Sequence, residues 1–288
     1  MNVHPQRSMR SVSVRTFSAI SATILAFSST TAAAQNGDPL TRPYPDAACS
    51  SCAEWNQPQA PVRLHGNTYY VGTHGLTALL ITSPEGHVLI DGALPNSAPL
   101  IMENVRALGV RVEDIKLILN SHVHFDHAGG LAALQRASGA RVAASVPSAP
   151  VLEAGTSAAG DPQHGSLLDF PAVRNVRRFA DGETLRVGPI AVTAHLTPGH
   201  TQGGTTWTWR SCDDAGQGSE WLHAIPTSQH AAAISIKITP SGLPAIAANS
   251  DESSNIAATI ARVKPIQPRR LTGCANIKPD NTAHTGMV

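Results

Sequence analysis

The sequence lacks an excess of either charge: among 288 residues, 21 Lys and Arg face 20 Asp and Glu. Because nucleic-acid binding depends on clustered positive charge, this balance gives no reason to expect a nucleic-acid partner. Beyond residue 40 the chain also lacks an apolar run long enough to cross a bilayer, and it lacks the exposed heptads that would indicate a fixed helical partner. A composition of 42% hydrophobic and 14% charged residues is typical of a soluble globular protein, which we expect to be a monomer.

Cysteine is scarce, and the four present are Cys49, Cys52, Cys212 and Cys274. The C-x-x-C pair at Cys49 and Cys52 could indicate zinc or redox chemistry. The chain has no second C-x-x-C, so a structural zinc site is weakly supported, and structural thiols or a disulfide are the better interpretation.

The N-terminus has the pattern of an export signal. A basic head (residues 7–15, with three arginines) precedes a short apolar stretch at 17–27 and small residues before Gln35. We therefore expect a signal peptide over 1–34, a periplasmic or secreted mature protein, and a single domain over 35–288. A disordered tail or an N-terminal anchor is the alternative.

Strands and helices are predicted to alternate, which favours an α/β fold with sheet at the centre. Apolar spacing predicts a helix over 97–110 with Ser97 as its N-cap and a second over 131–140 closed by Gly139. The expected strands are 66–73, 77–83, 87–92, 115–121, 141–145, two within 183–200, 205–210 and 233–239, and a further helix is expected at 255–263. Trp207 and Trp209 share one strand face and are expected to lie in the core.

The stretch NSHVHFDHAGG (120–130) gathers four ligand-type side chains: His122, His124, Asp126 and His127. Buried together without a ligand they would be costly, because each polar group needs a partner. In an extended segment His122 and His124 point the same way, because side chains alternate along a strand, while Asp126 and His127 fall where the chain bends. Imidazole nitrogens with one carboxylate suit Zn²⁺, and iron or manganese would also accept this set.

A catalytic zinc needs a third protein ligand and one open position. The best candidate is His200 in LTPGHTQGG, because it follows a predicted strand and is flanked by glycines and a proline. His195 lies within the strand, so we expect it to be packed or hydrogen-bonded.

The segment HVHFDHAGG (122–130) matches the H-x-H-x-D-H motif of the metallo-β-lactamase superfamily. Together with GNTYYVGTHGLTALLITSPEGHVLIDGA, IMENVRALGV, DPQHGSLLDFP and LTPGHTQGGTTWTWRSC, it resembles the subclass B3 metallo-β-lactamases over about residues 55–212. The resemblance implies an αβ/βα four-layer sandwich, exported from the cytoplasm, that hydrolyses the amide bond of β-lactam antibiotics.

Carried over to this sequence, the resemblance implies two zinc ions. His122, His124 and His200 would bind the first, and Asp126 and His127 the second. A zinc-bound hydroxide would attack the β-lactam carbonyl, with Asp126 holding this nucleophile in line. Gln163 in DPQHGS would contact the substrate.

The resemblance ends near residue 213, and about 213–288 is atypical. The family's serine-bearing segment is replaced by WLHAIPTSQHAA (221–232), and nothing matches the last histidine of the second zinc site. Cys274 lies near its expected position, and His284 follows ten residues later. An abrupt divergence or a change of reading frame would produce this pattern, and either would weaken the second zinc site and impair activity.

Two other interpretations remain compatible with the motif. One is a different hydrolase of the same fold: a glyoxalase II-like thioesterase, a lactonase or a phosphodiesterase. Glyoxalase II-type enzymes carry a bridging aspartate after the His200-type ligand, and no Gly-Asp or Ala-Asp dipeptide follows here. The other is a metal-binding remnant without catalytic activity.

Overall fold

The computed structural model describes Met1 and residues 38–212, 219–226 and 234–239. The predicted signal peptide, the helix expected at 255–263, Cys274 and His284 lie outside these residues. Contacts between α-carbons divide the chain into residues 1–36 and a larger unit, 37–288, to which all of the following refers. In the part of the chain that the structure describes, no helix has both the length and the apolar character needed to cross a membrane.

A seven-stranded sheet forms the first half of the unit, with its strands in chain order from β1 to β7. The first four strands pair antiparallel, and β4 to β7 pair in parallel. The strands are β1 (Val62–His65), β2 (Thr68–Tyr70), β3 (Leu79–Ile81), β4 (His87–Ile90), β5 (Ile115–Leu119), β6 (Arg141–Ser145) and β7 (Arg177–Phe179).

A second sheet of five antiparallel strands follows in the order β12-β11-β10-β9-β8. Its strands are β8 (Thr184–Val187), β9 (Ile190–Leu196), β10 (Thr205–Cys212), β11 (Ser219–Pro226) and β12 (Ile234–Thr239). The strands β11 and β12 therefore extend this sheet beyond residue 212, where the sequence becomes atypical.

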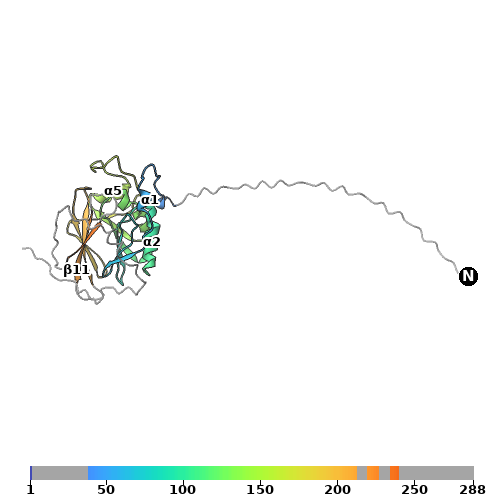
Figure 1. Cartoon of the computed structure of the whole chain (residues 1–288), viewed down its shortest axis with the longest axis horizontal. Coiled ribbons are helices and arrows are strands. Elements are labelled where there is room, and N and C mark those ends of the chain that lie inside the picture. The colour runs from blue at the N-terminus through green and yellow to red at the C-terminus, as the bar shows by residue number, and fades with distance from the viewer. Residues whose placement is uncertain (2–37, 213–218, 227–233, 240–288) are drawn as a thin grey trace, which may run out of the picture. The chain divides into compact units, whose positions relative to one another are not determined.

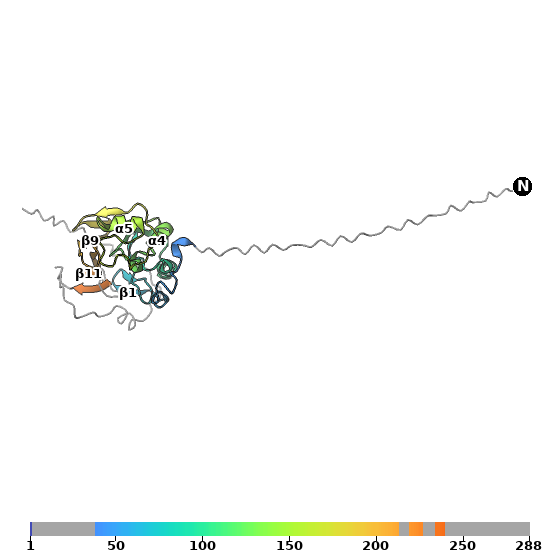
Figure 2. The same ribbon diagram turned by 90° about the horizontal axis from the view of Figure 1, so that it is seen from above.

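The helices of the described residues lie between residues 39 and 154 of the chain. They are α1 (Cys52–Trp55), α2 (Ala98–Ala107), α3 (Phe125–Ala128), α4 (Leu131–Ser138) and α5 (Ser148–Ala154), with short 3-10 turns at Pro39–Thr41, Pro95–Ser97 and Val112–Asp114. Figure 1 and Figure 2 show these helices on one side of the unit and the strands β9 and β11 on the other.

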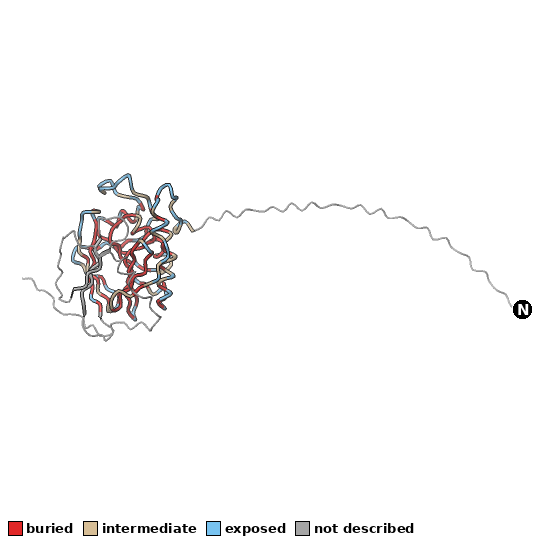
Figure 3. Tube along the Cα trace, in the orientation of Figure 1, coloured by how far each residue is buried: buried red, intermediate tan, exposed pale blue. Residues whose placement is uncertain are grey.

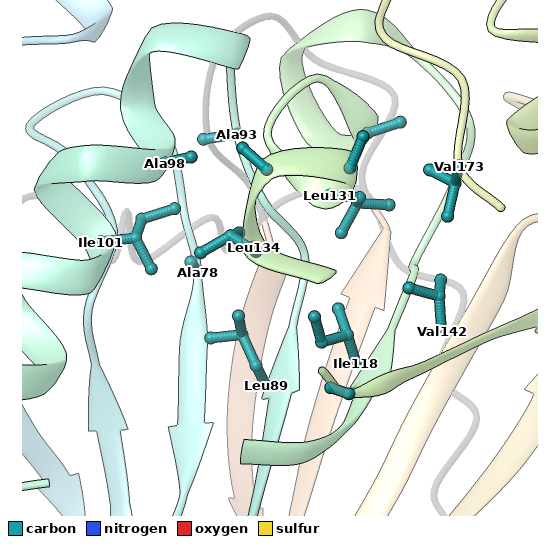
Figure 4. Packing of buried hydrophobic residues seen from close by; sticks show 14 of the residues in the cluster. Ala78, Leu89, Ala93, Ala98, Ile101, Ile118, Leu131, Leu134, Val142 and Val173 are labelled. Atoms are coloured by element: carbon teal, nitrogen blue, oxygen red, sulfur yellow. The ribbon is translucent and has the colours of Figure 1, made fainter. Parts of the chain in front are cut away.

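The helices pack on the outer face of the first sheet through one apolar cluster. Figure 4 shows Ile101 from α2 and Leu131 and Leu134 from α4 above Leu89 of β4 and Ile118 of β5. Each of these five side chains is at most 1% exposed. Burying side chains of this size stabilises the fold by about 1.5–3 kcal/mol each relative to exposure.

A second apolar cluster fills the space between the two sheets. Val88 and Ile90 of β4 contribute to it from the first sheet, and Val192, Trp207 and Trp209 from the second. Both tryptophans are fully buried, which confirms that they belong to the core. Because β4 and β5 are covered on both faces over most of their length, Val88–Ile90 and Leu117–Leu119 are continuously apolar rather than alternating.

The α/β class predicted from the sequence is confirmed. Within the described residues the layers are helices, first sheet and second sheet, and Figure 3 shows buried residues running through all three. A fourth, helical layer beyond the second sheet is not found among residues 38–212, 219–226 and 234–239. It would have to come from the rest of the chain.

The element predictions are mostly confirmed, with one misassigned helix cap and several short elements missed. The helix α4 ends at Gly139, whose positive φ of 69° suits glycine. Ser97 does precede α2, but its hydroxyl does not cap the helix. Instead it accepts a hydrogen bond from the Leu94 amide and donates one to Asn56. The short strands β1 and β7, the helix α5 and the strand β11 were missed.

A pH-dependent loss of stability is expected from His87, at the start of β4. Burial, the largest influence, lowers its pKa below the usual value near 6.5, and Nδ1 accepts a hydrogen bond from the Ser83 amide. As the pH falls through about 6.5, His87 is protonated in the unfolded chain before it is protonated in the folded chain. The folded state therefore loses stability below that pH. His87→Gln should therefore lose less unfolding free energy between pH 7 and pH 5 than the wild type, by about 1.4 kcal/mol per unit of depressed pKa.

Urea unfolding at the two pH values measures this difference. His74→Gln is the matched control, because it makes the same change at an exposed position. An equal loss in the wild type and His87→Gln would show that His87 is not responsible.

Candidate metal centre

The H-x-H-x-D-H stretch begins where β5 ends, at the carboxyl edge of the parallel strands. His122 and His124 lie in the extended link after β5, and the chain turns into α3 directly after His124, whose φ and ψ are −87° and 155°. Asp126 and His127 therefore lie within the short helix α3, at the bend predicted from the sequence. Their amide and carbonyl groups close the turn, since the His127 amide donates to the His124 carbonyl at 3.0 Å.

Gly130 allows this turn to press against the end of β4. The Gly130 amide donates to the Ala93 carbonyl at 3.1 Å, and the Gly92 amide donates to the His127 carbonyl at 2.9 Å. A Cβ atom at Gly130 would lie 2.2 Å from the Gly92 carbonyl oxygen, so no larger residue fits without displacing backbone.

His200 reaches the same place from the second sheet, on the loop between β9 and β10. The Thr205 amide donates to the Ser121 carbonyl at 2.8 Å, which joins the end of this loop to the segment that follows β5. The Gly203 carbonyl accepts hydrogen bonds from Ser145 and Ser148. A Cβ at Gly203 would lie 2.1 Å from the Ser148 hydroxyl, so the second glycine of the loop is required for this contact.

These connections bring His122, His124 and His200 together. The ring centroids are 5.1 Å apart for His122 and His124, 4.8 Å for His122 and His200, and 4.4 Å for His124 and His200. One potential ligand atom from each residue lies within 4.8 Å of the others. Three imidazole nitrogens gathered in this way are a ligand set that suits Zn²⁺.

A second group consists of His122, Asp126 and His127, whose potential ligand atoms also lie within 4.8 Å of one another. The His127 Nε2 atom is 3.7 Å from the nearer Asp126 carboxylate oxygen, and the rings of His122 and His127 have centroids 4.0 Å apart. His122 belongs to both groups. Among the described residues the second group thus has no third ligand of its own.

The protonation of the first group suits metal binding. Burial, followed by the neighbouring His127, His124 and His200, lowers the pKa of His122 well below its usual range. Burial and then His124 likewise lower the pKa of His200. Both imidazoles are therefore neutral near pH 7, as a metal ligand must be.

Asp91 is a component of the site that the sequence analysis missed. It follows β4, is fully buried, and adopts a φ of 63° that is unusual for a residue other than glycine. One carboxylate oxygen accepts from the Ser121 amide at 2.7 Å and the Asn120 side chain at 3.2 Å. The other contacts the Ser121 hydroxyl at 2.5 Å and His127 Nδ1 at 2.8 Å. The sequence signal that could have identified Asp91 is that it is a single acidic residue at the end of an otherwise apolar strand.

The Asp91 contact fixes the orientation of His127. With its Nδ1 proton donated to the carboxylate, His127 presents Nε2 as the ligand atom. Burial works to lower the pKa of His127, but the charge of Asp126 and the hydrogen bond and charge of Asp91 outweigh it and raise the pKa. The site therefore favours a positive charge beside His127, and a bound cation would satisfy the same two carboxylates.

Two comparisons with known proteins bear on this arrangement. A family model described as "Metallo-beta-lactamase superfamily" matches residues 71–208. A B3 metallo-β-lactamase described as the first with an active-site glutamic acid is 48% identical, with a TM-score of 0.61, over 65% of this chain and 68% of that one. The chain belongs to the subclass B3 metallo-β-lactamase family.

Two further structures illustrate the range of similarity. MEM-A1, a subclass B3 enzyme isolated from a soil metagenome library, is 55% identical over 59% of this chain and 63% of its own, with a TM-score of 0.57. MIM-1 from Novosphingobium pentaromativorans is 41% identical over 62% of this chain and 65% of its own, with a TM-score of 0.59. The chain thus matches less than two thirds of the length of MEM-A1, and the same holds for Rm3 (64%) and SMB-1 (62%).

Within the residues that the structure describes, none of the other candidate residues of this B3 family member belongs to either metal-binding group. His195 Nε2 is 2.9 Å from the Thr208 hydroxyl, in agreement with a hydrogen-bonded strand residue. Gln163 is exposed in the loop 155–170. Cys49 and Cys52 form a disulfide. Cys274 and His284 lie outside the described residues.

A groove of about 830 Å³ lies elsewhere on the domain, and it does not contain the histidines. It is lined by Lys116, at the amino end of β5, by Arg141, at the start of β6, and by Arg186 of β8. Because parallel strands place their carboxyl ends at one edge, this groove is at the opposite edge from His122 and His124. Ligand chemistry, rather than cavity size, identifies the site.

Replacing Asp91 by asparagine should weaken metal binding at His127. The asparagine side chain would either point its NH₂ group toward His127 Nδ1 or lose the hydrogen bonds that Ser121 donates. In both cases the His127 ring would no longer be held with Nε2 toward the metal position. Removing such an outer carboxylate commonly costs 10–100-fold in metal affinity. The buried donors left without a carboxylate should also reduce the free energy of unfolding by about 1–3 kcal/mol.

Chelator competition and urea unfolding measure the two effects. Asp114→Asn is a control, because that carboxylate pairs with Arg111 on the surface. Unchanged metal affinity in Asp91→Asn would contradict the orienting role of Asp91.

Proposed function

We propose that this chain is an exported, zinc-dependent β-lactamase that hydrolyses the amide bond of β-lactam antibiotics. The observation that carries the proposal is the convergence of His122, His124 and His200 from two sheets onto one point. Two of these imidazoles are held neutral by burial and by each other. Three nitrogen ligands with a remaining open position are the set that catalytic zinc requires.

The histidines fit zinc by their number, spacing and protonation, and they would hold the first ion. Asp126 and His127 would hold a second ion, for which the described residues offer only the shared His122 as a third donor. Bound zinc supplies a nucleophilic water at neutral pH and polarises the carbonyl that this water attacks. Iron or manganese would accept similar ligands, so metal identity needs direct measurement.

The protein groups have separate tasks in this reaction. Asp126, whose side chain is 17% exposed, is open enough to accept a hydrogen bond from the attacking water and orient it toward the lactam carbon. Attack would form a bond between that water oxygen and the carbonyl carbon. The ring C–N bond would then break, and the nitrogen would take up a proton that the water has lost, leaving a carboxylate and an amine. Gln163, exposed on its loop, would contact the substrate.

The atypical C-terminal region suggests that activity is impaired. The first group of histidines is complete within residues 38–212, whereas the second group lacks a third ligand of its own there. We therefore propose one firmly bound zinc per chain and a weak second site. Cys274 and His284, which lie outside the described residues, are the candidates for its third ligand. The predicted signal at 1–34 supports export to the periplasm or beyond, where a monomer would meet antibiotic.

Metal counting with nitrocefin and carbapenem turnover tests this proposal. The purified chain should hold about one zinc and hydrolyse a carbapenem, while a thioester or lactone should be poor substrates. Folded protein that holds zinc without turnover would indicate the metal-binding remnant. Turnover of a thioester or lactone in preference to a carbapenem would indicate another hydrolase of the fold.

His200→Ala should abolish tight zinc binding and turnover, because two histidines alone cannot complete a site that needs three protein ligands. His195→Ala is the matched control: it lies five positions earlier, loses only its contact with Thr208, and should keep its zinc. Measuring zinc content after dialysis separates the two variants. Equal zinc retention in both would exclude His200 as a ligand.

A further inference from the structure

The loop 155–170 is a closed surface loop next to the candidate metal centre. The two ends of the loop are joined by the Phe170 amide, which donates to the Gly155 carbonyl at 2.9 Å. The Tyr44 hydroxyl, from an earlier part of the chain, donates to the Asp169 carbonyl at 2.8 Å and holds the loop there. Most of the loop between these points is exposed, including Gln163. Figure 3 shows exposed segments of this kind at the margin of the domain.

Asp161 is the exception, because its side chain is only 5% exposed. One carboxylate oxygen lies 3.0 Å from Nε2 of His124, and the other accepts a hydrogen bond from the Gln163 amide at 2.8 Å. A single carboxylate thus links a candidate metal ligand to the residue proposed to contact substrate.

Gly160, the residue before Asp161, contacts the segment that carries His200. The Gly160 carbonyl accepts a hydrogen bond from the Gln202 side chain at 3.3 Å, two positions after His200. Residues 160 and 161 therefore contact both segments that carry histidines of the first group. A change in the conformation of the loop would therefore alter contacts both at His124 and at Gln202, beside His200.

The contact with His124 also decides which ring nitrogen can bind a metal. A carboxylate is only an acceptor, so it favours the tautomer of His124 that carries a proton on Nε2. The lone pair then lies on Nδ1, which becomes the nitrogen available to an ion shared with His122 and His200. Carboxylates in this position orient the ring and raise its basicity as a ligand.

We propose that Asp161 is a positioning residue that couples metal binding at His124 to the conformation of the Gln163 loop. This inference rests on the proposed function, since it takes His124 as a metal ligand. The coupling is reciprocal: an ion that fixes His124 also holds Asp161 and the loop, and a loop that holds Asp161 strengthens binding of the ion. Binding of zinc would thereby prepare the loop for substrate.

Asp161→Asn separates the two contacts of the carboxylate. The asparagine oxygen can keep its hydrogen bond from the Gln163 amide, but its NH₂ group then faces His124 Nε2 and favours the wrong tautomer. We expect zinc affinity to fall 10–100-fold, as for other outer-shell changes. Asp161→Ala should lose both contacts, with the same loss of affinity and faster hydrogen exchange at the Gln163 amide.

Asp169→Asn is the matched control, because it makes the same change at an exposed position of the same loop. Three measurements are needed: zinc affinity by chelator competition, hydrogen exchange of residues 155–170 with and without zinc, and ¹⁵N chemical shifts of the His124 ring. In the wild type, zinc should slow exchange of the loop, and the shifts should show a proton on Nε2. In Asp161→Asn both effects should be reduced, whereas Asp169→Asn should match the wild type.

Equal zinc affinity in Asp161→Asn and Asp169→Asn, or an unchanged His124 tautomer, would overturn the inference. Its failure is distinguishable from failure of the proposed function. If the wild type bound no zinc, the proposed function would fail, and the ring shifts of the zinc-free protein would still report on Asp161. If the wild type bound zinc and the Asp161 variants bound it equally well, only the positioning role would be wrong.

Discussion

The candidate site depends on the hydrogen-bonded junction between the segment after β5 and the start of β10. These strands belong to different sheets, and each sheet supplies part of the histidine cluster. The Thr205 amide donates to the Ser121 carbonyl at 2.8 Å, and the Trp207 indole donates to the Asn120 carbonyl at 3.2 Å. Both acceptors lie immediately before His122, so the junction sets the distance between the H-x-H segment and the loop of His200.

Each of the three histidines of the H-x-H-x-D-H motif is oriented by a polar contact at one ring nitrogen. Ser121 contacts Nδ1 of His122 at 3.2 Å, Asp161 contacts Nε2 of His124, and Asp91 contacts Nδ1 of His127. Each contact leaves the opposite nitrogen of that ring for an ion. Asp91 and Asp161 are distant in the sequence from the histidines that they contact, whereas Ser121 is adjacent to His122. The buried carboxylate of Asp91 is tolerated because four donors surround it. Preorganisation of this kind is what a metal centre requires.

Much of the fold could be predicted because local pattern and tertiary environment agree. The helix α4 has apolar residues on one face and Gly139 at its end, and the hairpin of β3 and β4 turns at a glycine with positive φ. Strands β1 and β7 were missed because three or four residues carry too little periodic signal and take their structure from their neighbours. Ser97 was misjudged because its hydroxyl found a partner in Asn56, which is distant in sequence.

The sequence by itself determined the α/β class and the motif at 122–127, and it favoured His200 over His195 as the third candidate ligand. Those features depend on residue type and local spacing, which a chain carries before it folds. Only the tertiary structure decided that Asp91 and Asp161 contact the histidines and that His122 is shared by two groups. The reason is that hydrogen-bond partners 36 or 37 positions apart are brought together by the packing of whole strands and loops, which no local pattern encodes.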